Sequence, residues 1–313
     1  MTLRIAIGIP TYRRPAQLAQ LLAALPERIA EVPGRIEVVV LVVDNDEAAS
    51  ARSAAAAAPL PVRYAVEPHP GIAAVRNRLL DLAGACDLLA FIDDDELPLP
   101  GWLSHLVTTW QRTGSAAVMG RVISVFDRQI DPWILETGVF RRRSRPTGLE
   151  LAAAAAGNLL VDLAQVRDAG VRFDPSLGLA GGEDTLFSKQ LIAAGGRVVW
   201  CDESRAEDPV PPDRMTRRWA MQRAFNGGNT AVQVELRLEP GPGRHAAIRL
   251  RRGLGGSGRA VMGWLRHVAG RARGDIAADA RGMRTAYRGL GMVAGALGHA
   301  HRQYARTEQG ALS

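Results

Sequence analysis

The chain has 313 residues, of which 47% are hydrophobic and 23% charged, a composition that excludes an intrinsically disordered protein. Its net charge is +7 and no run of 18 apolar residues occurs, so we expect no transmembrane helix. Cys86 and Cys201 lack metal-ligand spacing and the first residues lack a signal-peptide layout, which predicts reduced thiols and a cytoplasmic protein.

Short apolar runs alternate with helical patterns through the first hundred residues. Strands are predicted over Ile5–Ile9, Val38–Val43, Val62–Val66 and Leu88–Ile92, and helices over Pro15–Leu25 and Val75–Leu82. This alternation indicates an open α/β sheet with buried parallel strands. Because ligands bind such sheets at the carboxyl ends of strands, the polar residues that follow these strands are the first candidates for a site.

The second half of the chain has a less regular pattern. Helices are predicted over Trp102–Trp110, Glu183–Ala194 and Arg214–Phe225, and strands over Asn158–Val161 and Arg197–Cys201. A strand or a pair of strands is predicted over Ala116–Val125. We expect the helix over Arg214–Phe225 to end at Gly227-Gly228, because glycine commonly stops helices. Beyond Gly241-Pro242-Gly243 we expect short amphipathic helices that are interrupted by glycines.

These patterns predict two parts of the chain. Residues 1–240 would form one domain, with a nucleotide-binding half over 1–100 and an acceptor-binding half over 101–240. Residues 241–313 would form a helical extension, which is basic because it contains 13 arginines and 3 acidic residues.

The basic extension has two interpretations. Nucleic-acid binding is disfavoured, because Trp264, Tyr287 and Tyr304 are its aromatic residues and no known module is recognisable. We instead predict peripheral binding to the anionic inner face of the cell membrane, with Trp264, Leu265 and Val268 on one helix face. A partner protein or a homo-oligomer is also compatible with this segment.

Four carboxylates, Asp93 to Glu96, directly follow a predicted strand. Adjacent carboxylates about 4 Å apart repel by roughly 1 kcal/mol in water and by more near a protein surface. A divalent cation with oxygen ligands would remove this cost and could then hold a diphosphate. The alternative is an acidic turn that faces solvent, but the position after a strand favours a metal site with Mg²⁺ or Mn²⁺.

Residues that could hold a nucleotide base follow the first two strands. Tyr12 offers a flat face for stacking, and Thr11 offers a hydroxyl beside it. Asp44 could accept a hydrogen bond from a base imide, which fits uracil, or could belong to an ordinary turn. Arg76 follows Gly71 in a helix and could bind a base carbonyl or a phosphate, or could simply be solvated.

A second acidic pair opens a later helix after two glycines. A helix N-terminus stabilises an anion by roughly 0.3–1 kcal/mol, so Asp184 is expected to be ionised and able to accept a proton, unless it only caps the helix. Asn158, Glu183 and Trp219 are the predicted acceptor-binding residues, although Asn158 could equally cap a strand. Asp208 is either a third metal ligand or a turn residue before proline.

Six segments in this order resemble the inverting family 2 glycosyltransferases of the GT-A fold, over roughly residues 3–230. The segments are Pro10-Thr11-Tyr12-Arg13-Arg14-Pro15, Val43-Asp44-Asn45, Gly71-Ile72-Ala73-Ala74-Val75-Arg76-Asn77, Phe91-Ile92-Asp93-Asp94-Asp95, Gly157-Asn158-Leu159-Leu160-Val161 and Gly182-Glu183-Asp184-Thr185-Leu186-Phe187. The resemblance implies a Rossmann-like open mixed sheet with helices on both faces, followed by a C-terminal helical segment.

The resemblance also implies roles for individual residues. A nucleotide-sugar donor would be bound by Pro10, Thr11, Tyr12, Arg13, Asp44, Arg76, Asp93 and Asp94. Asp95, together with Asp93, would bind Mg²⁺ or Mn²⁺, and Asp184 would be the general base. The family often has a histidine near the position of Asp208, so this chain departs from the pattern at the third metal ligand.

The leading hypothesis is a metal-dependent, inverting, hexosyltransferase-type enzyme that uses a UDP-sugar. Its hydroxyl acceptor would belong to cell-surface polysaccharide, glycolipid or natural-product biosynthesis. One alternative is a retaining GT-A enzyme or a nucleotidyltransferase, although no glycine-rich activating loop with lysine follows the first strand. Another is a non-catalytic scaffold that binds nucleotide, sugar or membrane.

Overall fold

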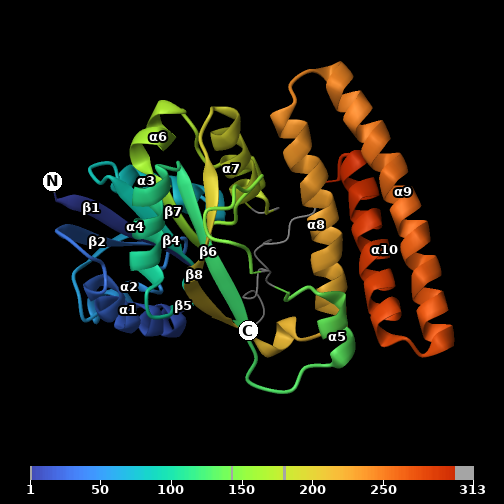
Figure 1. Cartoon of the computed structure of the whole chain (residues 1–313), viewed down its shortest axis with the longest axis horizontal. Helices are drawn as coiled ribbons and strands as arrows, with labels where there is room; N and C mark the ends of the chain where they lie inside the picture. The colour runs from blue at the N-terminus through green and yellow to red at the C-terminus, as the bar shows by residue number, and fades with distance from the viewer. Residues whose placement is uncertain (1, 142–143, 179–180, 300–313) are drawn as a thin grey trace. The chain divides into compact units, whose positions relative to one another are not determined.

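The computed structural model describes residues 2–141, 144–178 and 181–299. The chain divides into two units, which are drawn in Figure 1 and described separately below. Unit 1 comprises Met1–Asp127, Arg142–Pro175 and Glu183–Val210, and unit 2 comprises Arg128–Arg141, Ser176–Gly182 and Pro211–Ser313. The predicted boundary at residue 240 lies inside unit 2, and residues 300–313 of the predicted extension lie outside the described residues.

Unit 1 is built on a mixed sheet, which has eight strands over the described residues. The strands are β1 (Leu3–Thr11), β2 (Ile36–Asp44), β3 (Val62–Val66), β4 (Leu88–Ile92), β5 (Leu97–Pro98), β6 (Ala117–Val125), β7 (Asn158–Asp162) and β8 (Val198–Pro209). Their order is β3-β2-β1-β4-β7-β6-β8-β5. The first four strands are parallel, whereas β7 runs antiparallel to β4 and β6. The predicted open mixed sheet is confirmed.

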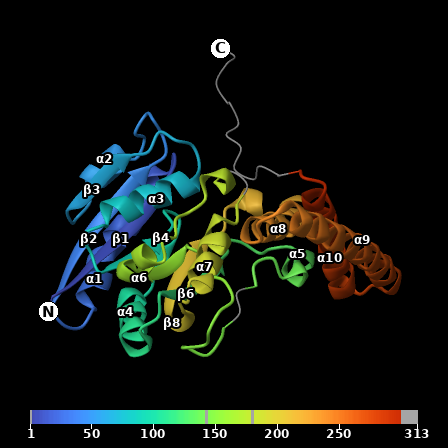
Figure 2. The same ribbon diagram turned by 90° about the horizontal axis from the view of Figure 1, so that it is seen from above.

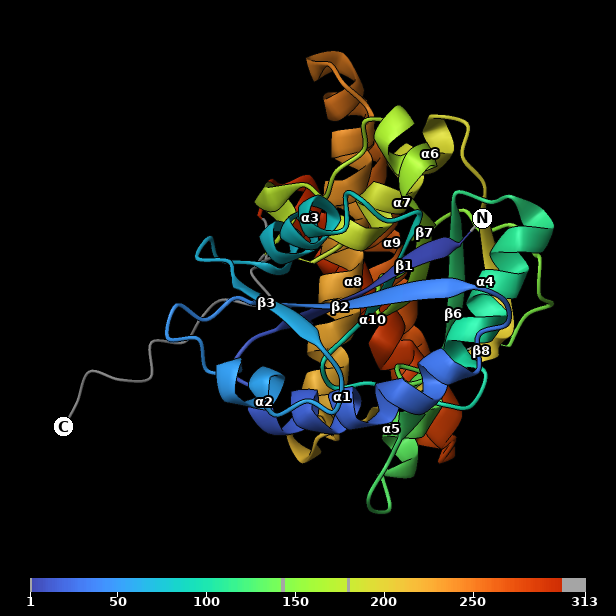
Figure 3. The same cartoon turned by 90° about the vertical axis from the view of Figure 1, so that its left-hand side faces the viewer.

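Helices cover both faces of this sheet, as Figure 3 shows for the part around β1, β2 and β3. One face packs against α1 (Pro15–Ala30), α2 (Arg52–Ala56) and α4 (Trp102–Thr113). The other packs against α3 (Ile72–Leu82), α6 (Leu163–Asp168) and α7 (Glu183–Ala193). Buried strands with apolar residues on both faces explain why β1, β2 and β4 are nearly continuous hydrophobic runs.

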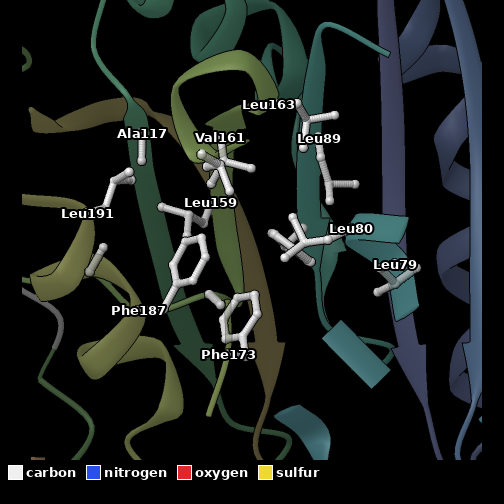
Figure 4. Close-up of a cluster of buried hydrophobic side chains, with 14 of the residues drawn as sticks. Leu79, Leu80, Leu89, Ala117, Leu159, Val161, Leu163, Phe173, Phe187 and Leu191 are labelled. Atoms are coloured by element: carbon white, nitrogen blue, oxygen red, sulfur yellow. The ribbon is translucent and has the colours of Figure 1, made fainter. Parts of the chain in front are cut away.

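Phenylalanine rings anchor α7 to the sheet, in the core that Figure 4 shows. Phe187 of α7 stacks on Phe173 with ring centroids 4.2 Å apart, and Phe173 meets the edge of Phe91 at 5.8 Å. Fully burying one such side chain contributes roughly 1.5–3 kcal/mol to stability. This packing holds the start of α7, and therefore Glu183 and Asp184, near the end of β4.

The strand β8 is longer than the sequence predicts. It was expected to end at Cys201 but continues to Pro209, where it pairs with β6 after a register shift between Gly120 and Arg121. The polar sequence of its second half indicates a loop, but pairing in a sheet is made by the backbone and tolerates these side chains. Asp208 lies in this strand opposite Ser124.

Unit 2 consists mainly of long helices. The long helices are α8 (Arg217–Leu238), α9 (Pro242–Arg273) and α10 (Ile276–Ala296), and α5 (Pro132–Thr137) is a short one. One 3-10 turn covers Pro212–Arg214, and another, Pro175–Leu177, begins at the last residue of a unit 1 segment. Figure 2 shows α8, α9 and α10 side by side. The predicted helix end at Gly227-Gly228 was wrong, and α9 is one helix of 32 residues where short helices were expected. Across the described residues, the structure contains no helix with both the length and the apolarity to span a bilayer.

Several of the glycines that suggested helix ends in the sequence lie inside continuous helices, at positions where two helices come into close contact. A Cβ atom added to Gly263 of α9 would collide with the backbone nitrogen of Ala286 in α10, and one on Gly289 would lie 2.5 Å from the carbonyl oxygen of Gly256. On the other side of α10, a Cβ on Gly228 of α8 would collide with the carbonyl oxygen of Arg288. The glycines are therefore contact points where the helix backbones touch.

Candidate active site

The carboxyl ends of three parallel strands of unit 1 carry the predicted polar residues. Thr11 ends β1 directly opposite Asp44, which ends β2, and the acidic run begins immediately after β4. The sheet register therefore brings together residues that lie more than 80 positions apart in the sequence, as shown by the hydrogen bond from Thr11 Oγ1 to Asp94 Oδ2 (2.7 Å). This edge is where open α/β sheets bind ligands.

Arg76 joins the acidic run to the start of α7. Its Nη1 donates to Glu183 Oε1 at 2.5 Å, and its Nη2 donates to Asp93 Oδ1 at 3.2 Å. The side chain is buried, and its guanidinium lies 5.8 Å from the ring centroid of Phe173. The alternative of a solvated helical arginine is therefore wrong, and Arg76 is the link between the two acidic groups.

Arg14 holds the other side of the acidic run. Its Nη1 donates to Asp94 Oδ1 at 3.1 Å and to Asp95 Oδ2 at 2.6 Å. No role is predicted for Arg14 from the sequence, although its position between the end of the first strand and the following helix could have indicated one. The positive charge that the acidic run needs is thus supplied in part by the chain itself.

The buried carboxyl groups nevertheless carry more negative charge than these arginines balance. Burial raises the pKa of Asp94 to about 6, although Arg14 opposes this shift. Burial raises the pKa of Glu183 to about 7, and the neighbouring charge of Asp184 adds to the effect. Burial also raises the pKa of Asp93 against the opposing charge of Arg76. A further cation at this site would therefore be favourable.

The residues of the acidic run suit a divalent cation that would be bound partly by the protein and partly by a substrate. Their oxygen atoms are the donors that Mg²⁺ and Mn²⁺ prefer. A Cβ atom at Gly157 would lie 2.6 Å from Glu96 Oε1 and 3.2 Å from Asp93 Oδ2, so glycine there keeps the space beside these carboxylates open. Within the described ranges no three His, Cys, Asp or Glu side chains form a ready metal site. The donor set therefore fits an ion held by one or two carboxylates and completed by phosphate oxygens and water.

Asp44, the predicted base-binding residue, is fully buried and accepts three hydrogen bonds from the chain itself. Its Oδ1 accepts from the backbone N–H of Asp46 at 2.9 Å. Its Oδ2 accepts from the backbone N–H of Ala51 at 2.9 Å and from the Tyr64 hydroxyl at 2.7 Å. Asp44 therefore fixes the loop that follows β2, at the edge where a base is expected.

The neighbouring Asn45 was not predicted as a site residue, yet it shapes the same edge. Its Nδ2 donates to the carbonyl oxygens of Glu67 and His69 at 2.7 and 2.8 Å. Its Oδ1 accepts from the backbone N–H of Gly71 at 2.9 Å. Asn45 thereby attaches the segment between β3 and α3 to the end of β2.

The segment after β1 forms an aromatic and cationic surface. Pro10 pairs with Val43 inside the sheet, and the following Tyr12 is half-buried. The guanidinium of Arg13 lies 5.1 Å from the ring centroid of Tyr12 and also pairs with Asp46 at 3.3 Å. Arg13 has a φ of 55°, in the left-handed region that non-glycine residues rarely adopt.

Asp184 is placed differently from its neighbour Glu183. It is half-buried in the first turn of α7, and its Oδ1 accepts from the backbone N–H of Thr185 at 2.6 Å. Its negative charge raises the pKa of both Glu183 and Asp93, so it lies close to both carboxylates. Asp184 is thus the more accessible carboxylate of the pair, whereas Glu183 is buried against Arg76.

The remaining predicted acceptor residues, Asn158 and Trp219, have other neighbours within their own units. Asn158 is 1% exposed and its Oδ1 accepts from the indole N–H of Trp102 at 2.9 Å, so its side chain faces α4 in the core of unit 1. Trp219 belongs to α8 of unit 2, where its ring stacks on Phe140 with centroids 5.3 Å apart. Within unit 1, the structure therefore groups Glu183 with the other carboxylates but does not group Asn158 with them.

Comparisons with known sequences give relatives for most of the chain. Residues 6–160 match the family Glycosyl transferase family 2. The succinoglycan biosynthesis protein ExoM of Rhizobium meliloti is 36% identical over 235 residues, which covers 73% of this chain and 74% of that protein. A pre-mycofactocin glycosyltransferase of Mycobacterium tuberculosis is 28% identical over 229 residues, which covers 67% of this chain and 43% of that protein.

Comparisons with solved structures show the fold. Residues 1–349 of S. aureus TarS superpose with a TM-score of 0.51 at 14% identity, and the match covers 90% of each chain. The same protein in complex with UDP-GlcNAc gives a TM-score of 0.50 at 13% identity. Together with the sequence relationship to ExoM and the match over residues 6–160, these findings establish that the chain is a glycosyltransferase that belongs to glycosyl transferase family 2.

Proposed function

We propose that the enzyme is a metal-dependent, inverting glycosyltransferase that transfers a sugar from a UDP-sugar to a hydroxyl group in cell-surface polysaccharide biosynthesis. The observation that carries the proposal is the grouping of Asp93, Asp94 and Asp95 with Glu183 and Asp184 around Arg14 and Arg76. The donor class is supported by the UDP-GlcNAc complex of TarS, and the acceptor class by the succinoglycan biosynthesis protein ExoM.

Donor binding would use the strand-end edge. Tyr12 and Arg13 would provide the surface for the base, and Asn45 holds the segment between β3 and α3 in place. Asp93 and Asp95 would hold Mg²⁺ or Mn²⁺, which when bound neutralises charge on the departing nucleoside diphosphate. Arg14 and Arg76 hold the carboxylates in position before a ligand arrives.

Asp184 is the proposed general base. An inverting transfer needs one carboxylate that takes the proton of the acceptor hydroxyl as the new bond forms. The half-buried position of Asp184 in the first turn of α7 leaves it accessible to an acceptor. Glu183 holds Arg76 in place and is a positioning residue in this scheme.

The substitution Asp184→Asn tests the base. Turnover should fall about 10²–10⁴-fold, because amide nitrogen and oxygen cannot take the proton. UDP binding in the presence of Mn²⁺ and thermal stability should stay at wild-type values. Asp168→Asn, which changes an exposed acid at the end of α6, is the matched control and should leave turnover unchanged. Transfer at the wild-type rate by the Asp184→Asn enzyme would exclude Asp184 as the base.

The stereochemistry and metal requirement can be measured separately. NMR of the product should show an anomeric configuration opposite to that of the donor sugar, and an unchanged configuration would favour the retaining alternative.

In a thermal-shift comparison of UDP-, GDP- and dTDP-sugars, Mn²⁺ should increase stabilisation by the UDP-sugar. Asp95→Asn should remove that increase, and an increase of wild-type size would place the metal elsewhere.

We also propose that α9 attaches the enzyme to an anionic membrane surface. Large apolar side chains of α9 are exposed, including Trp264 at 54%. The others are Leu250, Leu254, Val261, Met262, Leu265 and Val268. The helix also carries arginines and no acidic residue, which suits an amphipathic helix on anionic lipid. Leu254→Glu with Leu265→Glu should reduce flotation with phosphatidylglycerol vesicles, and unchanged flotation would reject this role.

A further inference from the structure

A cavity of unit 2 is lined almost entirely by arginines. Its lining residues are Arg259 of α9 and Arg281, Arg284, Thr285 and Arg288 of α10, and its volume is about 270 Å³. All of these residues belong to unit 2, and none of them is assigned a role in the proposed transfer reaction.

The helix geometry explains how four guanidinium groups gather at one place. Arg281, Arg284 and Arg288 are spaced by three and four positions, so they lie along one face of α10. Arg259 is brought to the level of Arg288 because α9 and α10 touch there: a Cβ atom at Gly289 would lie 2.6 Å from the backbone nitrogen of Ala260. A side chain at residue 289 would separate the helices and widen the cavity.

The chain balances little of this positive charge. Arg281 pairs with Glu136 at 2.6 Å, and Arg284 donates to the carbonyl oxygen of Thr137 at 3.0 Å. Arg259 meets the sulfur atom of Met292 at 3.3 Å. No hydrogen bond or ion pair of Arg288 occurs among the residues that the structure describes. Burial lowers the pKa of Arg288, and the charges of Arg259, Arg284 and Arg252 lower it further.

We propose that this cavity binds a phosphate or diphosphate group, carried either by a lipid headgroup or by a soluble ligand. Guanidinium groups bind phosphate oxygens through paired N–H donors, and several of them around one space suit a multiply charged anion. An anion there would also offset the repulsion between Arg259, Arg284 and Arg288. This site goes beyond the proposed transfer reaction and differs in chemistry from the donor site, which needs a cation to hold a diphosphate.

Calorimetric titration with inorganic pyrophosphate in the presence of EDTA tests the proposal. Without a divalent cation the acidic site of unit 1 repels pyrophosphate, so the measured binding reports the arginine cavity. Arg288→Gln should weaken binding about tenfold. It is the cleanest change, because no hydrogen bond within the described part of the chain is lost with it. Arg284→Gln combined with Arg288→Gln should weaken binding further.

Arg266→Gln is the matched control. Arg266 is an exposed arginine of α9 outside the cavity, so its removal lowers the net charge equally without changing the lining. Binding should be unchanged in this variant. Equal weakening by Arg266→Gln and Arg288→Gln would overturn the proposal, because it would show only a general attraction of the basic surface. Undetectable binding to the wild-type protein would overturn it as well.

A competition experiment identifies the source of the phosphate group. If phosphatidylglycerol vesicles displace pyrophosphate from the wild-type protein, the bound group belongs to a lipid headgroup. If pyrophosphate remains bound at saturating vesicle concentration, the natural ligand is a soluble phosphorylated molecule. Both outcomes support the site, and UDP binding with Mn²⁺ measured on the Arg288→Gln protein reports the donor site independently.

Discussion

The two units reach stability in opposite ways. In unit 1, large side chains such as Phe173, Phe187 and Trp102 fill the space between helices and sheet. In unit 2, the helices approach until backbones touch, and the contact points at Gly263 and Gly228 have no side chain at all. The comparison teaches that helices in one protein can be held in place either by large buried side chains or by close contact between backbones.

The units also differ in how charge is arranged. The acidic residues of unit 1 surround two arginines, whereas the arginines of the unit 2 cavity have one ion-paired carboxylate, Glu136, among the described residues. The overall charge of +7 describes neither site. Charge has to be counted within each site before a ligand is inferred, and this count is the basis for proposing a cation in unit 1 and an anion in unit 2.

Removing Arg76 should have the largest effect on stability. Arg76→Gln would leave Asp93 and Glu183 without their shared guanidinium, and breaking such a buried pair costs about 3–5 kcal/mol. The loss should be smaller at about pH 5, because Glu183, whose pKa is about 7, is then protonated. The free energy of unfolding from urea denaturation at both pH values measures this.

Arg172→Gln is the control for that experiment. Arg172 pairs with Asp81 at 2.6 Å on the exposed surface of unit 1, so its loss should cost no more than about 1 kcal/mol. Similar losses for the two variants would show that burial does not distinguish the Arg76 pair from an ordinary surface pair.

A pair of glycine substitutions tests how unit 2 is held together. Gly263→Ala should destabilise the protein by about 1–3 kcal/mol, because its new methyl group would overlap the backbone of α10. Gly258→Ala, five residues earlier in the same helix, meets nothing within 4 Å and should stabilise the protein by about 0.5–1 kcal/mol. Denaturation of the two variants should therefore give changes of opposite sign, and stabilisation by both would refute the close approach.

A smaller effect, which depends on pH, is expected at Glu183. Its pKa is about 7 in the folded protein, against a reference value of 4.5, so its contribution to stability is present below about pH 4.5 and is lost as the pH rises to about 7. Glu183→Gln cannot ionise, so its stability relative to that of the wild type should increase as the pH rises from about 5 to about 8. A difference in melting temperature that does not vary with pH would contradict this.

Much of the candidate site could be predicted from the sequence. The acidic run after β4, and Thr11 and Asp44 at neighbouring strand ends, were located because parallel strands bring their carboxyl ends to one edge. The pairing of Arg76 with Glu183 could not be predicted, since 107 positions separate the two residues and only side-chain packing brings them together. For Asn158, the sequence did not reveal that Trp102 would bind it within the core.

The fold was predicted well where hydrophobic periodicity decides it and poorly where backbone contacts do. The predicted β3 and β4 ranges agree with the structure, and β4 in particular is a short apolar run that is buried throughout. Gly227-Gly228 indicated a helix end, but a glycine required for contact with a second helix has the same local sequence as one that ends a helix. The second half of β8 was missed because its pairing leaves no apolar pattern.

The spacing of glycines in α9 offers a way to recognise this architecture in other chains. Gly256, Gly263 and Gly270 recur every seven residues and face α10, where Gly282 and Gly289 have the same interval. An alignment of distant homologues that share these two helices should keep glycine at these positions, even where the neighbouring residues differ. Such a signature would distinguish chains with this C-terminal hairpin from those that share only the catalytic domain.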